Sequence, residues 1–359
     1  MGDDKLTQLR IKIDAIDRQL LELISERGRC AQAVAQVKAE TNPDSAFYRP
    51  EREAQVLRRV MRDNRGPLDD EQIARLFREI MSACLALEES LKVAFPDPEG
   101  AFTGQAAIKH FGHCAERVPM ATIDEVFREV AAGAVDYGVV PVENSIDGVV
   151  SQTLDSFMDF ALIICGEVVL PIHHCLLACD SSSEPVRIYA HAHTFAQCRQ
   201  WLDGRWPGIE RVAVNSNTEA AQRARQEPGS AAIASVMAAQ SCDLDILAHN
   251  IEDRPDNSTR FLIIGKQAVP PSGADKTSLL VSMRNQPGAL RTLLEPFYQH
   301  NIDLIRVETR PSRTGISRCV FFIDFAGHRE DVSVRTVLHQ LSELASDCRV
   351  LGSYPEEVL

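Results

Sequence analysis

The feature that most limits how this chain folds is an uninterrupted helical pattern near its N-terminal end. Apolar residues recur with a period of 3.6 from Leu6 to Val37, and no proline comes before Pro43. The pattern predicts one helix of roughly 35 residues, about 50 Å long at 1.5 Å per residue. Its apolar residues, called the apolar stripe below, are Leu6, Leu9, Ile13, Ile16, Leu20, Leu23, Ile24, Val34 and Val37.

Two shorter helices follow in the sequence. Pro50 opens one over residues 51–63, and the other begins near Asp69 and extends to about Leu91. These two helices are too short to cover an apolar stripe about 50 Å long. We therefore expect a second copy of the chain to cover the rest, in a homodimer or a larger assembly.

Beyond residue 92 the pattern changes. Short apolar runs alternate with helical stretches over 93–268, which is typical of an α/β domain, and their separated groups indicate two lobes. The Pro, Ser and Gly residues within 266–275 predict a linker. The order strand–helix–strand–strand–helix–strand that follows is the ferredoxin-like arrangement. The chain is thus predicted to have an all-α domain over 1–92, an α/β domain over 93–268 and an α+β domain over 276–355.

Composition excludes several classes of function. A net charge of −13 argues against a nucleic-acid partner, because the phosphates would be repelled. No apolar run approaches the roughly 20 residues that a membrane span needs. The ten cysteines are irregularly spaced and include no CxxC pair, which favours a reducing, cytoplasmic setting. A local basic pocket for a small anion is compatible with all of this.

Charged residues lie on the apolar side of the three predicted helices. Arg27 and Lys38 share the apolar face of the long helix, and Arg52 and Glu53 share the inward face of the second. On the third helix Glu88 faces inward, four residues after Cys84. A buried cation is costly unless an anion meets it. Two interpretations remain open, a pocket for a small dianion and a structural ion-pair network.

Residues 6–91 resemble the all-helical chorismate mutase domain. The motifs that carry the resemblance are Leu9-Arg10, Glu26-Arg27, Val37-Lys38 and the run from Phe47 to Glu53. The resemblance implies that four cations hold the two carboxylates and the ether oxygen of chorismate, one of them donated by the partner chain. The four are Arg10, Arg27, Lys38 and Arg52, with Arg10 the partner's contribution.

Further site positions follow from the same resemblance. Glu53 accepts a hydrogen bond from the ring hydroxyl of the substrate. Arg49, Cys84 and Glu88 stand where the family has Asp, Ser and Gln, and Glu88 donates to the ether oxygen only when it is protonated. The rearrangement needs one reactive conformer and donors aimed at the ether oxygen, so Lys38 and Glu88 are the expected catalytic residues.

Three polar clusters stand out in the α/β domain. Glu143-Asn144-Ser145 follows a strand, Thr259-Arg260-Phe261 precedes one, and His173-His174-Cys175 lies between them. Alternation along a strand puts His174 on the opposite face from His173 and Cys175, which disfavours a zinc site, and we expect no metal or other cofactor. The first two clusters fit an anion site in a cleft between lobes. Ordinary turn polarity is the alternative.

Together these clusters resemble prephenate dehydratase. The motifs are the run from Gly138 to Ser145, His174-Cys175-Leu176-Leu177 and Thr259-Arg260-Phe261. The resemblance implies a two-lobed, periplasmic-binding-protein-like fold and the loss of carbon dioxide and water from prephenate. It makes Thr259 the catalytic residue and Arg260 the ligand of a carboxylate. The other residues that it places along the site are Glu143, Asn144, Ser145 and Phe261.

The last domain carries two motifs at strand ends. Gly288-Ala289-Leu290 begins a helix, whose free backbone N–H groups suit a carboxylate, although helix capping alone would explain the motif. The second motif, Glu308-Thr309-Arg310-Pro311, closes the next strand. Both motifs resemble those of the phenylalanine-binding regulatory (ACT) domain, which implies feedback inhibition by L-phenylalanine bound between two copies. The implied effector site is Gly288, Ala289, Leu290, Glu308, Thr309, Arg310 and Pro311.

The whole chain therefore resembles the bacterial bifunctional chorismate mutase/prephenate dehydratases. One departure lies in the loop from Pro96 to Ala101, where a glycine and a hydroxyl of the family are absent. Two alternatives follow, a dehydratase that prefers arogenate, and a chorismate mutase fused to a phenylalanine sensor with an impaired dehydratase site. The expected small-molecule partners are chorismate, prephenate and phenylalanine.

Overall fold

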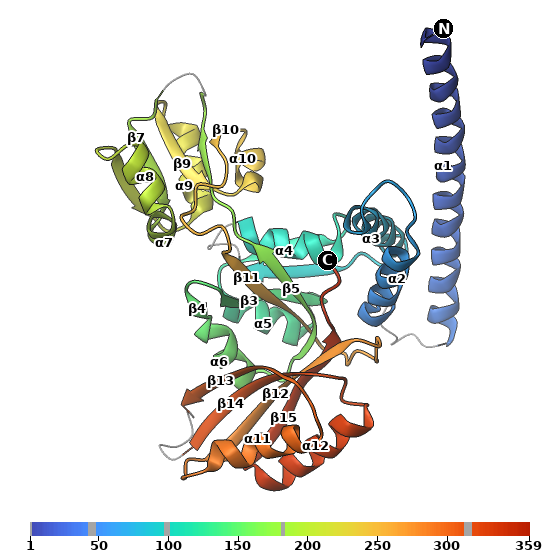
Figure 1. Ribbon diagram of the computed structural model, residues 1–359, viewed down its shortest axis with the longest axis vertical. Coiled ribbons are helices and arrows are strands. Elements are labelled where there is room, and N and C mark those ends of the chain that lie inside the picture. The colour runs from blue at the N-terminus through green and yellow to red at the C-terminus, as the bar shows by residue number, and fades with distance from the viewer. Residues whose placement is uncertain (1, 42–47, 97–100, 181–183, 312–317) are drawn as a thin grey trace.

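The computed structural model describes residues 2–41, 48–96, 101–180, 184–311 and 318–359. It has a helical N-terminal part, a two-lobed central part and a C-terminal part in which two helices cover one sheet (Figure 1). The predicted combination of an all-α, an α/β and an α+β fold is confirmed.

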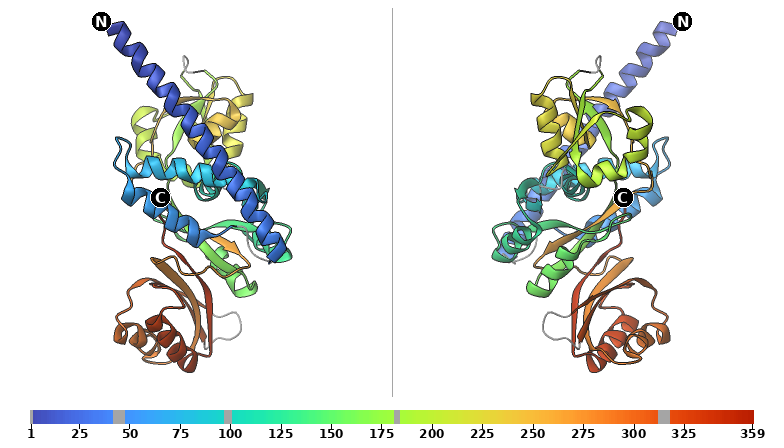
Figure 2. Two further views of the ribbon diagram at one scale, coloured as in Figure 1. Left: turned by 90° about the vertical axis from the view of Figure 1, so that its right-hand side faces the viewer. Right: turned by 90° about the vertical axis from the view of Figure 1, so that its left-hand side faces the viewer.

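Three helices form the N-terminal part: α1 (Gly2–Thr41), α2 (Pro50–Asp63) and α3 (Asp70–Ala86). The start of α3 is fixed by Asp69, whose side chain accepts from the Gln72 N–H at 2.7 Å while Gln72 caps the backbone of Asp69 in return. The third helix ends at Ala86, so it is shorter than predicted. The N-terminal half of α1 projects away from α2 and α3 (Figures 1 and 2). The apolar stripe on this half is accordingly exposed, with 46% of Leu6 and 49% of Leu20 accessible.

The first central lobe is built on a sheet of order β2-β1-β3-β11-β5, with β4 beside β3. Helix α4 covers one face through Ala106 and Phe111, and helices α5 and α6 cover the other through Phe127 and Phe157. The bounds are β1 (Lys92–Pro96), α4 (Ala101–Phe111), β2 (Glu116–Met120), α5 (Ile123–Ala132), β3 (Tyr137–Asn144), β4 (Gly148–Val149), α6 (Ser151–Asp159), β5 (Ile163–Pro171) and β11 (Ser258–Gly265).

The second lobe is inserted between β5 and β11, with sheet order β10-β6-β9-β7-β8. The two connecting segments lie side by side, because Ile172 N–H donates to Asn257 O and Ile251 N–H donates to His174 O, each at 2.9 Å. The bounds are β6 (Cys175–Ala178), β7 (Arg187–His191), α7 (Ala192–Gln197), α8 (Arg199–Arg205), β8 (Glu210–Val214), α9 (Asn217–Gln226), β9 (Ser230–Ala234), α10 (Val236–Cys242) and β10 (Asp245–Ala248).

The C-terminal part has the predicted ferredoxin-like order, and its sheet runs β13-β14-β12-β15. Its bounds are β12 (Asp275–Arg284), α11 (Ala289–Gln299), β13 (Leu304–Pro311), β14 (Arg318–Ala326), α12 (Val332–Leu344) and β15 (Asp347–Pro355). One face packs on α11 and α12, and the other shares a core with the first lobe through Phe322 and Tyr354. Here Gly352 lies so close to the Ile164 carbonyl that any side chain would clash. The first lobe and this sheet therefore form one packed body.

Candidate active sites

The long helix and the turn after α3 bring three predicted residues together, Arg27, Lys38 and Glu88. The Lys38 ammonium lies 3.9 Å from a Glu88 carboxylate oxygen, and both side chains are largely buried. Burial raises the pKa of the Glu88 carboxyl above its ordinary value, against the opposing effect of Lys38 and Arg27. Cys84 is buried at the end of α3. The sequence predicted that Glu88 would lie on the inward face of the third helix. Because α3 ends at Ala86, Glu88 reaches this cluster from the turn that follows the helix.

Four other predicted mutase residues do not join this cluster within one chain. Arg10 lies on the projecting half of α1 and Arg52 is exposed on α2. Arg49 pairs with Glu51 at 2.5 Å. Glu53 pairs with Arg78 of α3 at 3.1 Å.

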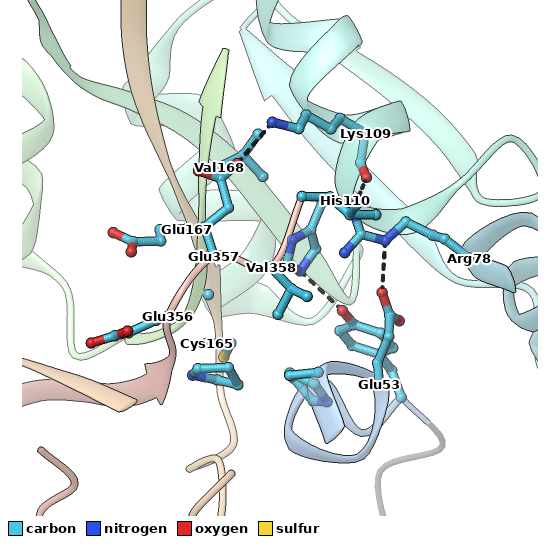
Figure 3. Close-up of a pocket in the computed structure, with 16 residues that line it drawn as sticks. Glu53, Arg78, Lys109, His110, Cys165, Glu167, Val168, Glu356, Glu357 and Val358 are labelled. Atoms are coloured by element: carbon cyan, nitrogen blue, oxygen red, sulfur yellow. Dashed lines mark hydrogen bonds and ion pairs between the residues drawn. The ribbon is translucent and has the colours of Figure 1, made fainter. Parts of the chain in front are cut away.

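Glu53 also contacts the central part of the chain. Because α2 packs against the first central lobe, Glu53 lines a cavity of about 30 Å³ shared with Lys109 and His110 (Figure 3). Arg78 also donates to the Lys109 carbonyl at 2.7 Å. The arrangement joins the helical part to the central part. Burial raises the pKa of Glu53, while Arg78 opposes the shift.

A second polar cluster lies where β3 ends and β11 begins. The strands pair Asn144 with Thr259, and the Asn144 side-chain amide donates to Thr259 Oγ1 at 2.8 Å and to Asn257 Oδ1 at 3.0 Å. Ser145 Oγ accepts from the Ser258 N–H at 3.0 Å. The predicted neighbours Asn144, Ser145 and Thr259 thus meet at the lobe boundary. Asn257 Oδ1 accepts from Asn144 and lies 3.4 Å from Ser145 Oγ, so it holds them together.

A chain of polar contacts continues from this boundary to the second lobe. His174 Nε2 lies 2.7 Å from Gln197 Oε1, and the Gln197 amide donates to Asp147 Oδ2 of the first lobe at 3.2 Å. The Phe102 ring meets the His174 ring edge-on at 5.7 Å. Burial lowers the pKa of His174, so its ring is neutral. Gln197 was not predicted, because nothing in a single sequence links it to Asp147 across 50 residues.

Two buried polar atoms at this boundary lack protein partners in the described part of the chain. They are His174 Nδ1 and Asn257 Nδ2. His174 Nε2 carries the proton that it donates to Gln197 Oε1, so Nδ1 is an acceptor, whereas the amide nitrogen of Asn257 is a donor. Buried polar groups are nearly always hydrogen-bonded, so these atoms are suited to a ligand. The described residues contain no group of three His, Cys, Asp or Glu side chains that could hold a metal ion. Loop residues 97–100, where the sequence departs from the family, lie outside the described part.

Arg260 does not point into this cluster, although the sequence placed it there as a carboxylate ligand. Its guanidinium donates to Glu167 at 2.8 Å, to Asp324 at 2.6 Å and to the Tyr354 hydroxyl at 3.0 Å. The reason is strand alternation, which sends Thr259 and Arg260 to opposite faces of β11. Phe261 returns to the Thr259 side but is buried in the core beside α4.

The predicted effector residues lie at one end of the C-terminal sheet. Strands β12 and β13 both run antiparallel to β14, so their C-terminal ends lie at the same end of the sheet. Gly288, which follows β12, and Pro311 therefore lie at that end. Gly288 has φ of 84°, a conformation that favours glycine, and caps α11. Arg310 donates to Ser151 at 2.8 Å and to Asp155 at 2.9 Å, so it faces the first lobe, and Glu308 shares that side of β13. Leu290 is 46% exposed.

Comparisons with known proteins match all three parts. Family models match residues 9–89 as chorismate mutase type II, 93–269 as prephenate dehydratase and 277–343 as an ACT domain. The chain is 59% identical to the bifunctional chorismate mutase/prephenate dehydratase of Pseudomonas aeruginosa, over 99% of each chain. It belongs to the bifunctional chorismate mutase/prephenate dehydratase family. The resemblance seen in the sequence motifs is confirmed.

Other members and solved structures agree with this family. The bifunctional chorismate mutase/prephenate dehydratase of Aquifex aeolicus is 42% identical over 99% of each chain. The crystal structure of the Arthrobacter aurescens prephenate dehydratase in complex with L-Phe is 34% identical, with a TM-score of 0.68, and covers 74% of this chain and 90% of that one. The chain is thus an enzyme with a chorismate mutase domain and a prephenate dehydratase domain, followed by an ACT domain. In its described part, no helix has the length and apolar character needed to cross a membrane.

Proposed function

We propose that this chain rearranges chorismate to prephenate in its helical domain and converts prephenate to phenylpyruvate in its central domain, under feedback inhibition by L-phenylalanine. The observation that carries the proposal is the presence of two separate polar clusters, each inside the segment that matches the corresponding family model. The full-length match to bifunctional relatives favours two activities over a mutase fused to a sensor.

The mutase reaction is a unimolecular rearrangement that needs no nucleophile. Holding the dianion in one reactive conformer and placing donors at the ether oxygen supply its catalysis. Arg27 and Lys38 provide positive charge where the Glu88 side chain is largely shielded from water. Burial raises the pKa of Glu88, which favours the protonated carboxyl, the form that donates to the ether oxygen.

The complete mutase site requires a second chain. The apolar stripe is exposed along α1, where a single copy leaves 49% of Leu20 and 62% of Leu23 accessible. An apolar face of this length is stabilised by association. We therefore assign the enzyme to a homodimer in which Arg10 of one copy completes the site of the other. The ten cysteines are free thiols, which suits the cytoplasm.

The dehydratase reaction breaks two bonds of prephenate. The electron pair of the breaking C–C bond to carbon dioxide moves into the ring, and hydroxide leaves from the opposite ring carbon. Asn144 donates to Thr259 Oγ1, so the Thr259 hydroxyl hydrogen is free to point toward the departing hydroxide. Aromatisation supplies the driving force, and one positioned donor assists the departure. Asn257 Nδ2 and His174 Nδ1 offer further contacts to the substrate.

The effector site is proposed at the ACT domain edge. The N–H groups at the start of α11 receive the phenylalanine carboxylate, and Gly288 lets it approach the backbone closely. Glu308 supplies the charge for the ammonium, and the exposed Leu290 meets the ring. A solved prephenate dehydratase of similar sequence was crystallised with L-Phe.

One coupled assay tests the proposal. Purified protein is supplied with chorismate, and phenylpyruvate is measured with and without phenylalanine. Formation of phenylpyruvate, reduced by phenylalanine, is the expected result. Prephenate that accumulates without phenylpyruvate would reject the dehydratase role. Prephenate and arogenate supplied side by side distinguish the two possible substrates.

A further inference from the structure

The edge strand β13 presents a row of charged residues to the first central lobe. Arg306, Glu308 and Arg310 alternate with exposed residues and are each half-buried on that side. In the register of the sheet, Arg306 lies opposite Asp324 of β14. The ion pair of Arg306 with Glu143 and the ion pair of Arg260 with Asp324 therefore cross the same domain boundary next to each other.

Arg306 lies between two carboxylates. Its Nε is 3.2 Å from Glu143 Oε2 and its Nη2 is 3.9 Å from Glu308 Oε1, while only 12% of the side chain is exposed. Both nitrogens are shielded from solvent, yet neither makes a hydrogen bond of good geometry. A buried guanidinium shared in this way has two alternative partners and a full hydrogen bond to neither. A small change in charge at one carboxylate shifts it toward the other.

Glu143 connects this guanidinium to the dehydratase cluster. It immediately precedes Asn144, which donates to Thr259 Oγ1 at 2.8 Å. In the register of β3 and β11, Glu143 pairs with Arg260 as Asn144 pairs with Thr259. Arg260 is fixed to Asp324 at 2.6 Å. One side of the junction is thus a close buried pair, and the other side is the looser contact of Arg306.

We propose that Arg306 is the positioning residue that couples the ACT motif to the dehydratase site. When a ligand ammonium occupies Glu308, the Arg306 guanidinium transfers fully to Glu143. The end of β3 then moves, and Asn144 leaves Thr259. The close pair of Arg260 and Asp324 holds the rest of the boundary fixed, so the shift reaches Asn144.

The coupling requires only a differential interaction. An effector shifts an equilibrium by its difference in affinity for the two states, and here that difference is the charge on Glu308. The inference rests on the proposed function, because it takes phenylalanine as the ligand of Glu308. It names Arg306 as a part that touches neither substrate nor effector, and Glu143, which the family resemblance places along the substrate site, as the carboxylate that Arg306 meets.

The test compares three variants of the full chain. Arg306→Gln removes the shared cation, and Arg306→Lys keeps the positive charge but replaces the guanidinium with a single ammonium group. Arg349→Gln is the matched control. Arg349 is also an arginine of the ACT sheet that donates to the first lobe, but its acceptor is the Phe157 carbonyl and not Glu143. Each variant is assayed for prephenate turnover with and without phenylalanine, and phenylalanine binding is measured by calorimetry.

The expected result separates binding from inhibition. Arg306→Gln binds phenylalanine at least as tightly as wild type, because the cation that shares Glu308 is gone, but the concentration for half inhibition rises about tenfold or more. Arg306→Lys lies between the two, and Arg349→Gln is inhibited like wild type. Equal inhibition of wild type and a folded Arg306→Gln would overturn the coupling alone. A wild-type enzyme that phenylalanine neither binds nor inhibits would overturn the proposed regulation as well.

A fourth variant tests the direction of the shift. Glu308→Gln leaves Arg306 with Glu143 as its one carboxylate, which is the arrangement assigned to the inhibited state. Its turnover of prephenate without phenylalanine is expected to fall about tenfold, with mutase activity unchanged. Full dehydratase activity in that variant would overturn the proposed transfer of the guanidinium.

Discussion

The guanidinium of Arg260 in the dehydratase domain donates to Asp324 of the ACT domain at 2.6 Å. Thr259 and Arg260 are adjacent in the sequence, but this buried pair gives Arg260 an interdomain role that Thr259 does not share. Thr259 faces the lobe boundary and meets Asn144, whereas Arg260 faces the ACT sheet. The dehydratase motif is therefore also an interdomain contact.

A substitution at Asp324 should consequently affect stability more than substrate binding. Asp324→Asn leaves the buried Arg260 with one carboxylate in place of two. Breaking a buried ion pair costs about 3 to 5 kcal/mol, so thermal unfolding should begin several degrees lower while the KM for prephenate changes little. Scanning calorimetry and steady-state kinetics measure the two effects. A large rise in KM with unchanged stability would return Arg260 to the substrate site.

The mutase should be sensitive to pH through Glu88. Burial raises the pKa of its carboxyl, and only the protonated form donates to the ether oxygen of the substrate. Mutase activity should therefore decline as pH rises through that pKa. Glu88→Gln carries a permanent donor and should flatten the decline. Identical pH profiles for the two folded proteins would remove Glu88 from the mechanism.

The apolar stripe should control assembly. Leu20→Asp places a charge on the exposed face that a second copy is proposed to cover, and should shift the protein from dimer to monomer in sedimentation experiments. Mutase activity should fall with it, because Arg10 of the partner is lost, while prephenate turnover continues. Glu22→Gln, on the opposite face of α1, is the control. A Leu20→Asp dimer with normal mutase activity would place the interface elsewhere.

The junction of the helical and central domains should weaken in acid. His110 lies 2.9 Å from the Tyr48 hydroxyl, and burial lowers the pKa of His110 to about 3. The unfolded chain binds a proton near pH 6.5, so this histidine contributes stability above that pH and loses it as pH falls toward 3. The loss is about 1.4 kcal/mol per pH unit. His110→Gln should remove this component in urea unfolding measured from pH 7 to pH 5. An unchanged pH dependence would argue against a neutral buried histidine.

How far the sequence predicted the molecule depends on the range of the interactions. The period of the apolar residues predicted α1, because helix geometry repeats every few residues. Alternation also governs β11, but Thr259, Arg260 and Phe261 were predicted to precede that strand, whereas the strand begins at Ser258. The opposite directions of Thr259 and Arg260 were missed for that reason.

Residues joined only by tertiary contacts were outside the reach of sequence patterns. Gln197 contacts Asp147, which is 50 positions away in the sequence. Glu53 was predicted to lie on the inward face of α2, but the α2 pattern does not show which neighbour covers that face. The neighbour is the central domain, and Glu53 pairs with Arg78 beside it.

Two single substitutions should separate the activities, because the two clusters share no residue and lie in different domains. Arg27→Ala removes a cation that acts on Glu88, and should reduce mutase turnover by about 3 kcal/mol of transition-state stabilisation without affecting prephenate turnover. Thr259→Ala removes the hydroxyl held by Asn144 and should abolish phenylpyruvate formation while prephenate still accumulates from chorismate. Thr259→Ser, which keeps the hydroxyl, is the matched control and should retain measurable turnover. Both reactions are followed on the same preparations, with circular dichroism to establish folding. If either alanine variant lost both activities while folded, the two reactions would have to share one site.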